Sequence, residues 1–205
     1  MISPKIKYLD ESTFLECLEQ QEFNRVIIDK NVNEEITLKD LEFNECKFIN
    51  INFKNIKLIR VDLIDCIFIN CDLSNVVFDF RSITRVQFVD SKLIGASFIN
   101  SSIRDLEIKN TNMQYVNFAG SHITNLKIDG SNLQDATINE CVLEKIDFND
   151  VDLEKSDILN TSLKNIDFSK CKIRGISIDL NSMKGMIINE FDSKYLVSLL
   201  GVKVR

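Results

Sequence analysis

The stretch NFAGSHITNLKIDGSNLQDA, residues 117–136, repeats one pattern every five residues. Large apolar residues such as Phe118 and Ile123 form the centres of the pattern, and a turn-forming residue often follows two positions later. Working outward in both directions, the same spacing begins at Leu38 and ends at Ile188. All 31 centres are large and apolar in a chain that is only 44% hydrophobic. Such fixed internal repetition predicts a solenoid.

A second inward class stands two residues before each centre, as at Cys46 and Ile51, and only Arg81 and Asn181 interrupt it. Two residues after the centre, 20 of 31 positions are Asn, Asp or Gly, which tolerate turn geometry. Each unit is therefore predicted to be a short extended piece followed by a turn. Neither a period of 2 nor a period of 3.6 fits, so the pattern indicates a coil closed on itself.

The pattern resembles that of the pentapeptide-repeat family, and NFAGS, NLQDA, SLKNI and DFSKC are instances of it. This resemblance covers residues 36–190. It implies an all-β fold, a right-handed quadrilateral β-helix with four pentapeptides per coil, in which residues twenty apart stack. At about 4.8 Å per coil the rod would be about 37 Å long. Two interior columns are expected, one of Leu58, Phe78, Phe98 and Phe118 and the other of Phe48, Phe68 and Phe88.

A solenoid needs caps that terminate its stacking edges. Residues 1–35 depart from the repeat and are predicted to form the N-terminal cap, with a helix over DESTFLECL, residues 10–18. Residues 191–205 are predicted to form a short helix, with Asp192 as its N-cap, and then a strand.

Composition narrows the class of protein. The net charge is -6, and no segment is apolar enough to be a signal peptide or a membrane span, so we expect a cytoplasmic protein without non-specific nucleic-acid binding. The cysteines form no CxxC pair, which indicates small buried hydrophobic residues rather than a zinc site or disulfides. We expect Cys46 and Cys66 to be packed, reduced neighbours. The six cysteines are Cys17, Cys46, Cys66, Cys71, Cys141 and Cys171.

Catalytic and cofactor motifs are missing from the sequence. His122 is the only histidine and falls at an outward position, which excludes catalytic triads and multi-histidine metal sites. The six glycines form neither GxGxxG nor a phosphate loop. We therefore expect no enzyme activity, no cofactor and no metal.

Residues 129–157 hold nine acids against two lysines, a local net charge of -7, which we call the acidic belt. It is interpreted either as a solvated surface or as a partner-binding surface that imitates duplex phosphate charge. Its acids are Asp129, Asp135, Glu140, Glu144, Asp147, Asp150, Asp152, Glu154 and Asp157.

The first coils have a different surface. Their outward positions hold Lys47, Lys54, Lys57 and Arg60, which is weak evidence for nucleic-acid contact. Apolar residues also stand at outward positions here. Either residues 1–35 cover them or they form a surface that a partner contacts. They are Ile49, Ile67, Ile69, Phe80 and Val89. Arg81 stands at an inward position and needs either a polar partner or a local bulge.

The C-terminal part, from NTSLKNIDFSKC to LVSLLGVKV, is similar to the Qnr-type quinolone-resistance proteins, especially their loop-free chromosomal Gram-positive branch. That resemblance implies a DNA mimic that binds DNA gyrase and topoisomerase IV and reduces the action of fluoroquinolones. It also implies a homodimer, with contacts from Tyr195, Leu196, Leu199, Leu200 and Val202.

The expected function is therefore protection of a type II topoisomerase, with the acidic belt against basic enzyme surface. Two alternatives stay open. One is an interaction scaffold for another partner that uses the apolar residues near Ile69 and Val89. The other is a self-immunity protein against a peptide toxin that poisons gyrase.

Overall fold

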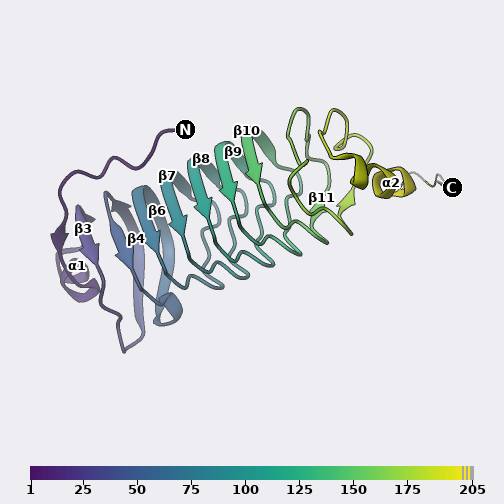
Figure 1. Ribbon diagram of the computed structural model, residues 1–205. Helices are drawn as coiled ribbons and strands as arrows, with labels where there is room; N and C mark the ends of the chain where they lie inside the picture. Colours follow the sequence, from purple (N-terminus) through teal and green to yellow (C-terminus); the bar gives the residue numbers. More distant parts are fainter. Residues whose placement is uncertain (200, 202, 204–205) are drawn as a thin grey trace.

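Parallel pairing between residues twenty apart builds the molecule. In the computed structural model, which describes residues 1–199, 201 and 203, β7 (Ser82–Val89) pairs with β8 (Ser102–Lys109) in the register Ile83↔Ile103. β9 (His122–Asp129) and β10 (Val142–Asn149) continue with the same offset. The coils stack into a rod (Figure 1). This arrangement confirms the predicted quadrilateral β-helix.

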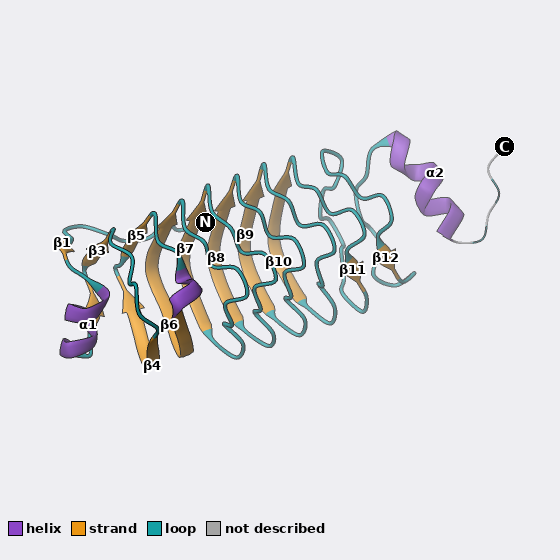
Figure 2. Cartoon of the chain, turned by 90° about the horizontal axis from the view of Figure 1, so that it is seen from below, coloured by secondary structure: helices purple, strands orange, loops and turns teal. Residues whose placement is uncertain are grey.

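Each coil has four sides, and we number them from one reference coil. In that coil Ile83 is the centre of the first side, Phe88 of the second, Leu93 of the third and Phe98 of the fourth. Strands form the first and second sides, whereas mostly turns and isolated bridges form the third and fourth sides (Figure 2). The earlier strands are β1 (Asp10–Glu11), β2 (Phe23–Asn24), β3 (Val26–Ile28), β4 (Ile36–Asn44), β5 (Lys47–Ile49) and β6 (Ile56–Ile69). The last two strands are β11 (Asp157–Ile158) and β12 (Ser177–Ile178).

The corners explain the turn-forming residues of the repeat. Nearly every fifth residue has a left-handed backbone, with φ between about 50° and 80°. Even Phe80 and Tyr115 adopt it, at φ 59° and 61°. The stacking of neighbouring coils therefore imposes this conformation on side chains that would ordinarily avoid it.

The interior holds the predicted aromatic columns. Neighbouring rings among Phe48, Phe68 and Phe88 lie 4.8 and 4.9 Å apart and are stacked. Phe78, Phe98 and Phe118 form the other column, with 5.2 and 5.0 Å between ring centres. Burial of each ring stabilises the fold by roughly 1.5–3 kcal/mol, so the columns are a main source of stability.

Buried hydroxyl groups fill many of the second inward positions. Ser121 Oγ donates to the Phe98 carbonyl at 2.5 Å and accepts a hydrogen bond from the Ser101 N–H at 3.0 Å. The thiol of Cys141, one coil later, donates to the Phe118 carbonyl at 3.1 Å. These positions take small side chains that bond to backbone groups at the corner, which explains the mixture of Ser, Thr and Cys.

The N-terminal cap contains α1 (Phe14–Gln20). The helix was predicted over residues 10–18, so it begins four residues later than predicted and ends two residues later. Thr13 caps it through a capping box with Glu16. Phe14 is fully buried and stacks on Phe48 at 5.8 Å, so the helix closes the end of the core. β2 and β3 already pair in register with the next coil, as in Phe23↔Phe43.

Residues before β1 run along the rod as a strap, toward β8 (Figure 1). The Lys5 N–H donates to Asp65 Oδ1 at 2.7 Å, and the Ile2 N–H donates to Asp105 Oδ1 at 2.8 Å. Both carboxylates are about 95% buried. The strap therefore follows the corner between the first and second sides, a path the sequence pattern does not indicate.

The C-terminal cap is α2 (Glu190–Leu199). The prediction that Asp192 is its N-cap is wrong, because the helix begins two residues earlier and Asn189 Oδ1 accepts the Asp192 N–H at 2.9 Å. The last coil also shifts by one residue. Ser182 is buried and binds the Thr161 N–H at 3.0 Å, while Asn181 is exposed, because the Asp179 carboxylate accepts both of their N–H groups in a tight turn.

Candidate functional site: the acidic belt

The acidic belt forms a collar around the rod rather than a stripe along it. Because one coil takes twenty residues, acids close in sequence lie on different sides. Glu144 and Asp147 project from the first and second sides on β10, Asp152 lies on the third side, and Asp157 lies on the fourth side at β11. A partner that approaches this part of the rod from any side meets carboxylates.

Three of the nine acids have close partners within the chain. Asp152 Oδ2 lies 3.2 Å from Lys172 Nζ, and Glu144 Oε1 lies 3.9 Å from His122 Nε2. Asp129 Oδ1 accepts a hydrogen bond from the Asn149 amide at 2.6 Å. Among the residues that the structure describes, the other six acids form no ion pair, and these are Asp135, Glu140, Asp147, Asp150, Glu154 and Asp157.

β10 is the last strand of the large sheet, and its outer edge is open. Within the described residues, no backbone hydrogen bond joins residues 142–150 to residues 162–169 in the next coil. Phe148 and Phe168 lie 5.4 Å apart but are tilted by 58°, unlike the stacked rings of earlier coils. Leu143 and Ile146 are partly exposed here, although their counterparts in β9 are buried. The belt therefore surrounds a break in the backbone ladder, which no signal in the five-residue pattern indicates.

The cations of the first coils are also spread around the rod. Lys47 lies on the second side, Lys54 on the third and Lys57 on the fourth. Arg60 is bound to Asp40 through an ion pair at the corner. A protein that binds a nucleic-acid duplex is expected to have a single basic face, and these cations do not form one.

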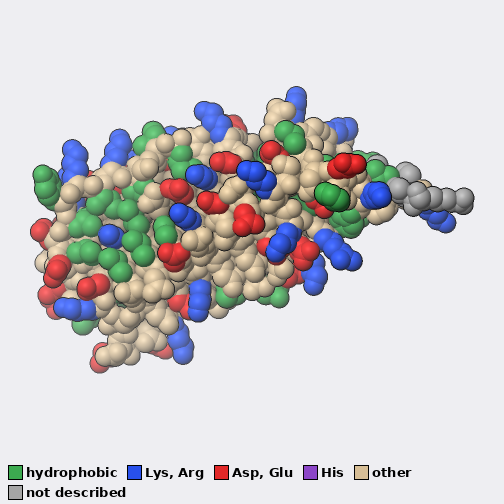
Figure 3. All heavy atoms as spheres, in the orientation of Figure 1, with side chains coloured by type: hydrophobic (Ala, Val, Ile, Leu, Met, Phe, Trp, Pro, Cys, Tyr) green, Lys and Arg blue, Asp and Glu red, His purple; other side chains and the backbone are tan. Residues whose placement is uncertain are grey.

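The outward apolar residues form a patch on the second side. Ile49, Ile69 and Val89 stack in register beside Ile67, and all four are half-buried. Figure 3 shows hydrophobic side chains gathered over the N-terminal strands on the face that it draws. We call these four residues the apolar patch. Phe80 stands apart from it at another corner and is 65% exposed.

Arg81 finds polar partners, as its inward position requires. Its Nε donates to the Asp79 carbonyl at 3.2 Å, and its Nη1 lies 3.9 Å from Asp62 Oδ1. The side chain is 23% exposed, so the guanidinium escapes from the apolar core. His122 is an exposed surface residue, as expected.

All six cysteines are buried and free, and Cys66 Sγ donates to the Phe43 carbonyl at 3.2 Å. Within the described part of the chain, no group of three or more His, Cys, Asp or Glu residues is arranged to hold a metal ion. None of the helices described is long and apolar enough to cross a membrane.

The predicted dimer residues divide into three groups. Leu196 is buried and Tyr195 is partly buried, and the Tyr195 hydroxyl donates to the Ile176 carbonyl at 3.2 Å, so both pack on the chain's own last coil. Leu199 is 44% exposed. Leu200 and Val202 lie outside the described residues. α2 also exposes Phe191, at 91%, which sequence reasoning did not single out.

Two models of pentapeptide repeats match the sequence. The pentapeptide repeat region matches residues 61–138, and pentapeptide repeats in eight copies match residues 38–79 and 131–175. Together they span most of the solenoid. The chain therefore belongs to the pentapeptide-repeat family.

Solved structures of the same repeat class are similar to this chain at low sequence identity. A trypsin-treated variant of QnrB1, a plasmid-mediated fluoroquinolone resistance protein, is 20% identical, with 98% of each chain covered and a TM-score of 0.45. Full-length QnrB1 is 18% identical over 87% of this chain and 89% of that one, with a TM-score of 0.35. HetL, a protein involved in heterocyst differentiation regulation from Nostoc sp. strain PCC 7120, is 14% identical over 86% and 95%, with a TM-score of 0.35. A search of curated protein sequences finds no match.

Proposed function

We propose that this protein is a non-catalytic binding rod of the cytoplasm that binds a type II topoisomerase, DNA gyrase or topoisomerase IV, and protects it from fluoroquinolones. The resemblance of the C-terminal sequence to the Qnr-type proteins suggests this partner. The observation that carries the proposal is the collar of carboxylates, six of which have no close partner in the described chain. A surface that holds and moves duplex DNA is basic, and a rod with such a collar is electrostatically complementary to it.

The free carboxylates make the collar a better ligand for cations than its net charge suggests. An acid already paired within the chain, such as Asp152, must give up that pair before it binds an enzyme lysine or arginine. Asp147 and Asp150 carry no such cost, and both are exposed. The open edge of β10 adds unpaired backbone groups at the same level of the rod.

We extend the proposal to a homodimer joined through α2. Phe191 is 91% exposed and Leu199 is 44% exposed on α2, and Leu180 in the last coil is 61% exposed. Burial of these side chains against a second copy would remove apolar surface from water and place two rods end to end. Equilibrium sedimentation of Phe191→Asp beside the native protein tests the dimer: the substitution is expected to give a monomer.

Supercoiling by DNA gyrase with ciprofloxacin present tests the main proposal. The belt variant carries Glu140→Lys, Asp147→Lys, Asp150→Lys and Asp157→Lys, which avoids the acids with partners inside the chain. The control variant makes the same change in charge at exposed acids of the N-terminal cap and first coil, Glu19, Glu22, Glu34 and Glu42. Native and control proteins are expected to restore supercoiling, and the belt variant is not. No restoration by the native protein at any ratio to enzyme would contradict the proposal.

The apolar patch favours a second candidate, a scaffold for a different protein. Half-buried Ile69 and Val89 are direct register partners on the parallel sheet, next to Ile49 in the same column. A pull-down with native bait and with baits carrying Ile69→Lys or the belt substitutions separates the two candidates. A scaffold partner would be lost with Ile69→Lys and kept with the belt variant.

A further inference from the structure

The backbone ladder on the fourth side is broken between two coils near the N-terminal end. In later coils, the Phe78 N–H donates to the Ser97 carbonyl at 2.7 Å and the Ser97 N–H donates to the Val76 carbonyl at 3.0 Å. One coil earlier, the same geometry would join Leu58 to Val77. No such bond exists among the described residues, and the series of bridges on this side starts only at Val77↔Ser97.

The first part of β6 is therefore an edge strand inside a solenoid. Residues 56–59 pair with 36–39 of β4 on one side, as in Leu38↔Leu58, and with no described residue on the other. Only from Leu63 onward does β6 pair with β7. An unpaired strand edge displays backbone donors and acceptors that accept another strand readily.

A local change of backbone causes the break. The corner residue Asn55 does not take the left-handed conformation that Asn75 adopts at φ 61° in the next coil. It belongs to the short 3-10 helix η1 (Phe53–Asn55), which Asn52 caps by accepting the Lys54 N–H at 2.8 Å. After Asn55, the fourth side of this coil continues as the extended strand β6. The fourth side of the following coil turns tightly instead, so the two backbones do not match and no ladder forms between these two described segments.

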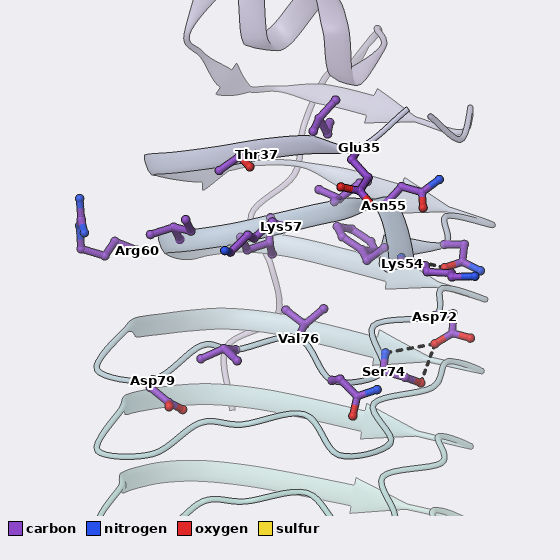
Figure 4. A pocket seen from close by; sticks show the side chains of 18 residues that line it. Glu35, Thr37, Lys54, Asn55, Lys57, Arg60, Asp72, Ser74, Val76 and Asp79 are labelled. Atoms are coloured by element: carbon purple, nitrogen blue, oxygen red, sulfur yellow. Dashed lines mark hydrogen bonds between the residues drawn. The ribbon is translucent and has the colours of Figure 1, made fainter. Parts of the chain in front are cut away.

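The mismatch leaves a groove of about 980 Å³ on the surface. β6 with Lys57 forms one wall, and the loop with Val76 forms the other (Figure 4). Leu58 and Val76 both line the groove and are each 8% exposed, whereas Phe78 and Phe98 in the regular coils are fully buried. The core is thus slightly open at the floor of the groove.

The side chains around the groove define the chemistry of an occupant. Lys54 and Lys57 are exposed, and neither forms an ion pair within the described part of the chain. Three acids also line the groove: Asp79 accepts from the Ser97 hydroxyl and the Ile99 N–H, Asp72 accepts from Ser74, and Glu35 is exposed with no partner among the described residues. Val77 is 52% exposed beside the same opening. The groove therefore offers two lysines without ion-pair partners, next to apolar surface, and its lining acids leave the whole site close to neutral.

We propose that this groove binds an extended peptide segment of a partner protein, which adds as a strand to the free edge of β6 at residues 56–60. Acidic side chains of the segment pair with Lys54 and Lys57, and alternate apolar side chains pack on Val77. The site lies several coils from the acidic belt and does not depend on the proposed topoisomerase partner.

Amide hydrogen exchange of the free full-length protein tests the open edge directly. The amides of Leu58, Arg60 and Val77 are expected to exchange at least about tenfold faster than their hydrogen-bonded counterparts in regular coils, the amides of Phe98, Asn100 and Ser97. Equal protection at both sets of positions would mean that the ladder is closed, and would overturn the proposal.

Binding of a designed peptide tests the occupant. The probe is a fluorescent Val-Glu-Val-Thr-Val-Glu-Val amide, compared with the same peptide in which Lys replaces Glu and with one N-methylated at alternate residues. The acidic peptide is expected to bind and to slow exchange at Leu58 and Val77, and the other two are not. Equal binding of the N-methylated peptide, or no binding of the acidic one, would overturn strand addition.

A charge variant with a matched control completes the test. Lys54→Glu with Lys57→Glu is expected to weaken binding of the acidic peptide about tenfold, as the loss of two exposed ion pairs predicts. Lys145→Glu with Lys164→Glu makes the same change in charge at exposed lysines far from the groove and is expected to leave binding unchanged. Equal weakening by both variants would show attraction by overall charge and contradict the groove.

Discussion

Arg85 donates hydrogen bonds from Nε and Nη2 to the two carboxylate oxygens of Asp65, one coil earlier at the same corner, at 2.7 and 2.6 Å. Asp65 also holds the strap through the Lys5 N–H. One buried carboxylate thus joins two coils and the N-terminal segment. Its environment differs from that of the exposed Arg60–Asp40 pair at another corner, where both side chains are more than half exposed.

Asp65→Asn is expected to lower the free energy of unfolding by about 1–3 kcal/mol, because it removes a charge-assisted pair in a place with little water. Urea unfolding measures the change. Asp40→Asn is the matched control and is expected to have a much smaller effect, since solvent screens that pair. Equal effects of the two substitutions would show that burial adds nothing to the Asp65 pair.

The same carboxylate makes stability depend on acid. Burial opposes ionisation of Asp65, but the Arg85 guanidinium and the Lys5 N–H prevail and hold its pKa below the ordinary value of 3.8. A carboxyl group whose pKa is lower in the folded protein than in the unfolded chain stabilises the fold. This stabilisation is complete above the pKa of the unfolded chain and is lost as the pH falls through the pKa of the folded protein. Between about pH 4 and pH 2, the native protein is therefore expected to lose stability more steeply than Asp65→Asn. Parallel stability curves in this range would contradict the assignment.

Gly120→Ala is expected to cost about 1–3 kcal/mol of stability. Gly120 has φ +69°, and a Cβ there would lie against Asn100 Oδ1 of the preceding coil. The left-handed backbone is strained for any side chain with a Cβ, although Phe80 adopts it at this same corner, and the contact with Asn100 adds to that cost. Combining Gly120→Ala with Asn100→Ala is expected to recover part of the loss in thermal unfolding. Without any recovery, the backbone conformation alone would explain the effect.

Much of the fold follows from the sequence, because the five-residue pattern records which side chains point inward and which residues turn the corner. The columns Phe48–Phe68–Phe88 and Phe78–Phe98–Phe118 could be named in advance for that reason. The breaks could not. Asn55 is as good a corner residue as Asn75 in the sequence, and only the η1 turn around it shows that the ladder opens there.

The acidic belt was visible as a run of charges, but its arrangement was not. Neighbours in sequence separate onto four sides, and whether an acid has a partner depends on the residue twenty positions away, as for Asp152 and Lys172. The C-terminal helix shows the same limit, because the pattern marks Leu196 and Leu199 as apolar but does not tell which faces the chain's own core.

The buried hydroxyl groups at the second inward positions predict that substitutions at Ser121 lower the stability by graded amounts. Ser121→Ala removes the closer of two acceptors for the buried Ser101 N–H, the other being the Phe98 carbonyl at 3.3 Å, and it also removes the hydroxyl that donates to that carbonyl. The loss is expected to cost about 1–3 kcal/mol. Ser121→Cys is expected to cost less, because Cys141 fills the same position one coil later and donates to the equivalent carbonyl. Urea unfolding of both variants ranks them, and a more stable Ala than Cys variant would contradict this role of the side chain.

The buried cysteines predict slow thiol chemistry in the folded protein. Burial raises the pKa of Cys71, Cys141 and Cys171 to about 11, and it raises the pKa of Cys17 and Cys66 as well. At about pH 8, a thiol with a pKa near 11 is thiolate only about one part in a thousand, and the thiolate is the reactive form. Ellman's reagent is therefore expected to label the native protein only as fast as it unfolds, and to label all six cysteines at once in urea. Urea at concentrations below the unfolding transition distinguishes labelling through global unfolding from labelling through a local opening. A labelling rate that stays proportional to the unfolding rate supports a closed core. Fast labelling of one thiol in the native protein would place that cysteine at an opening between coils.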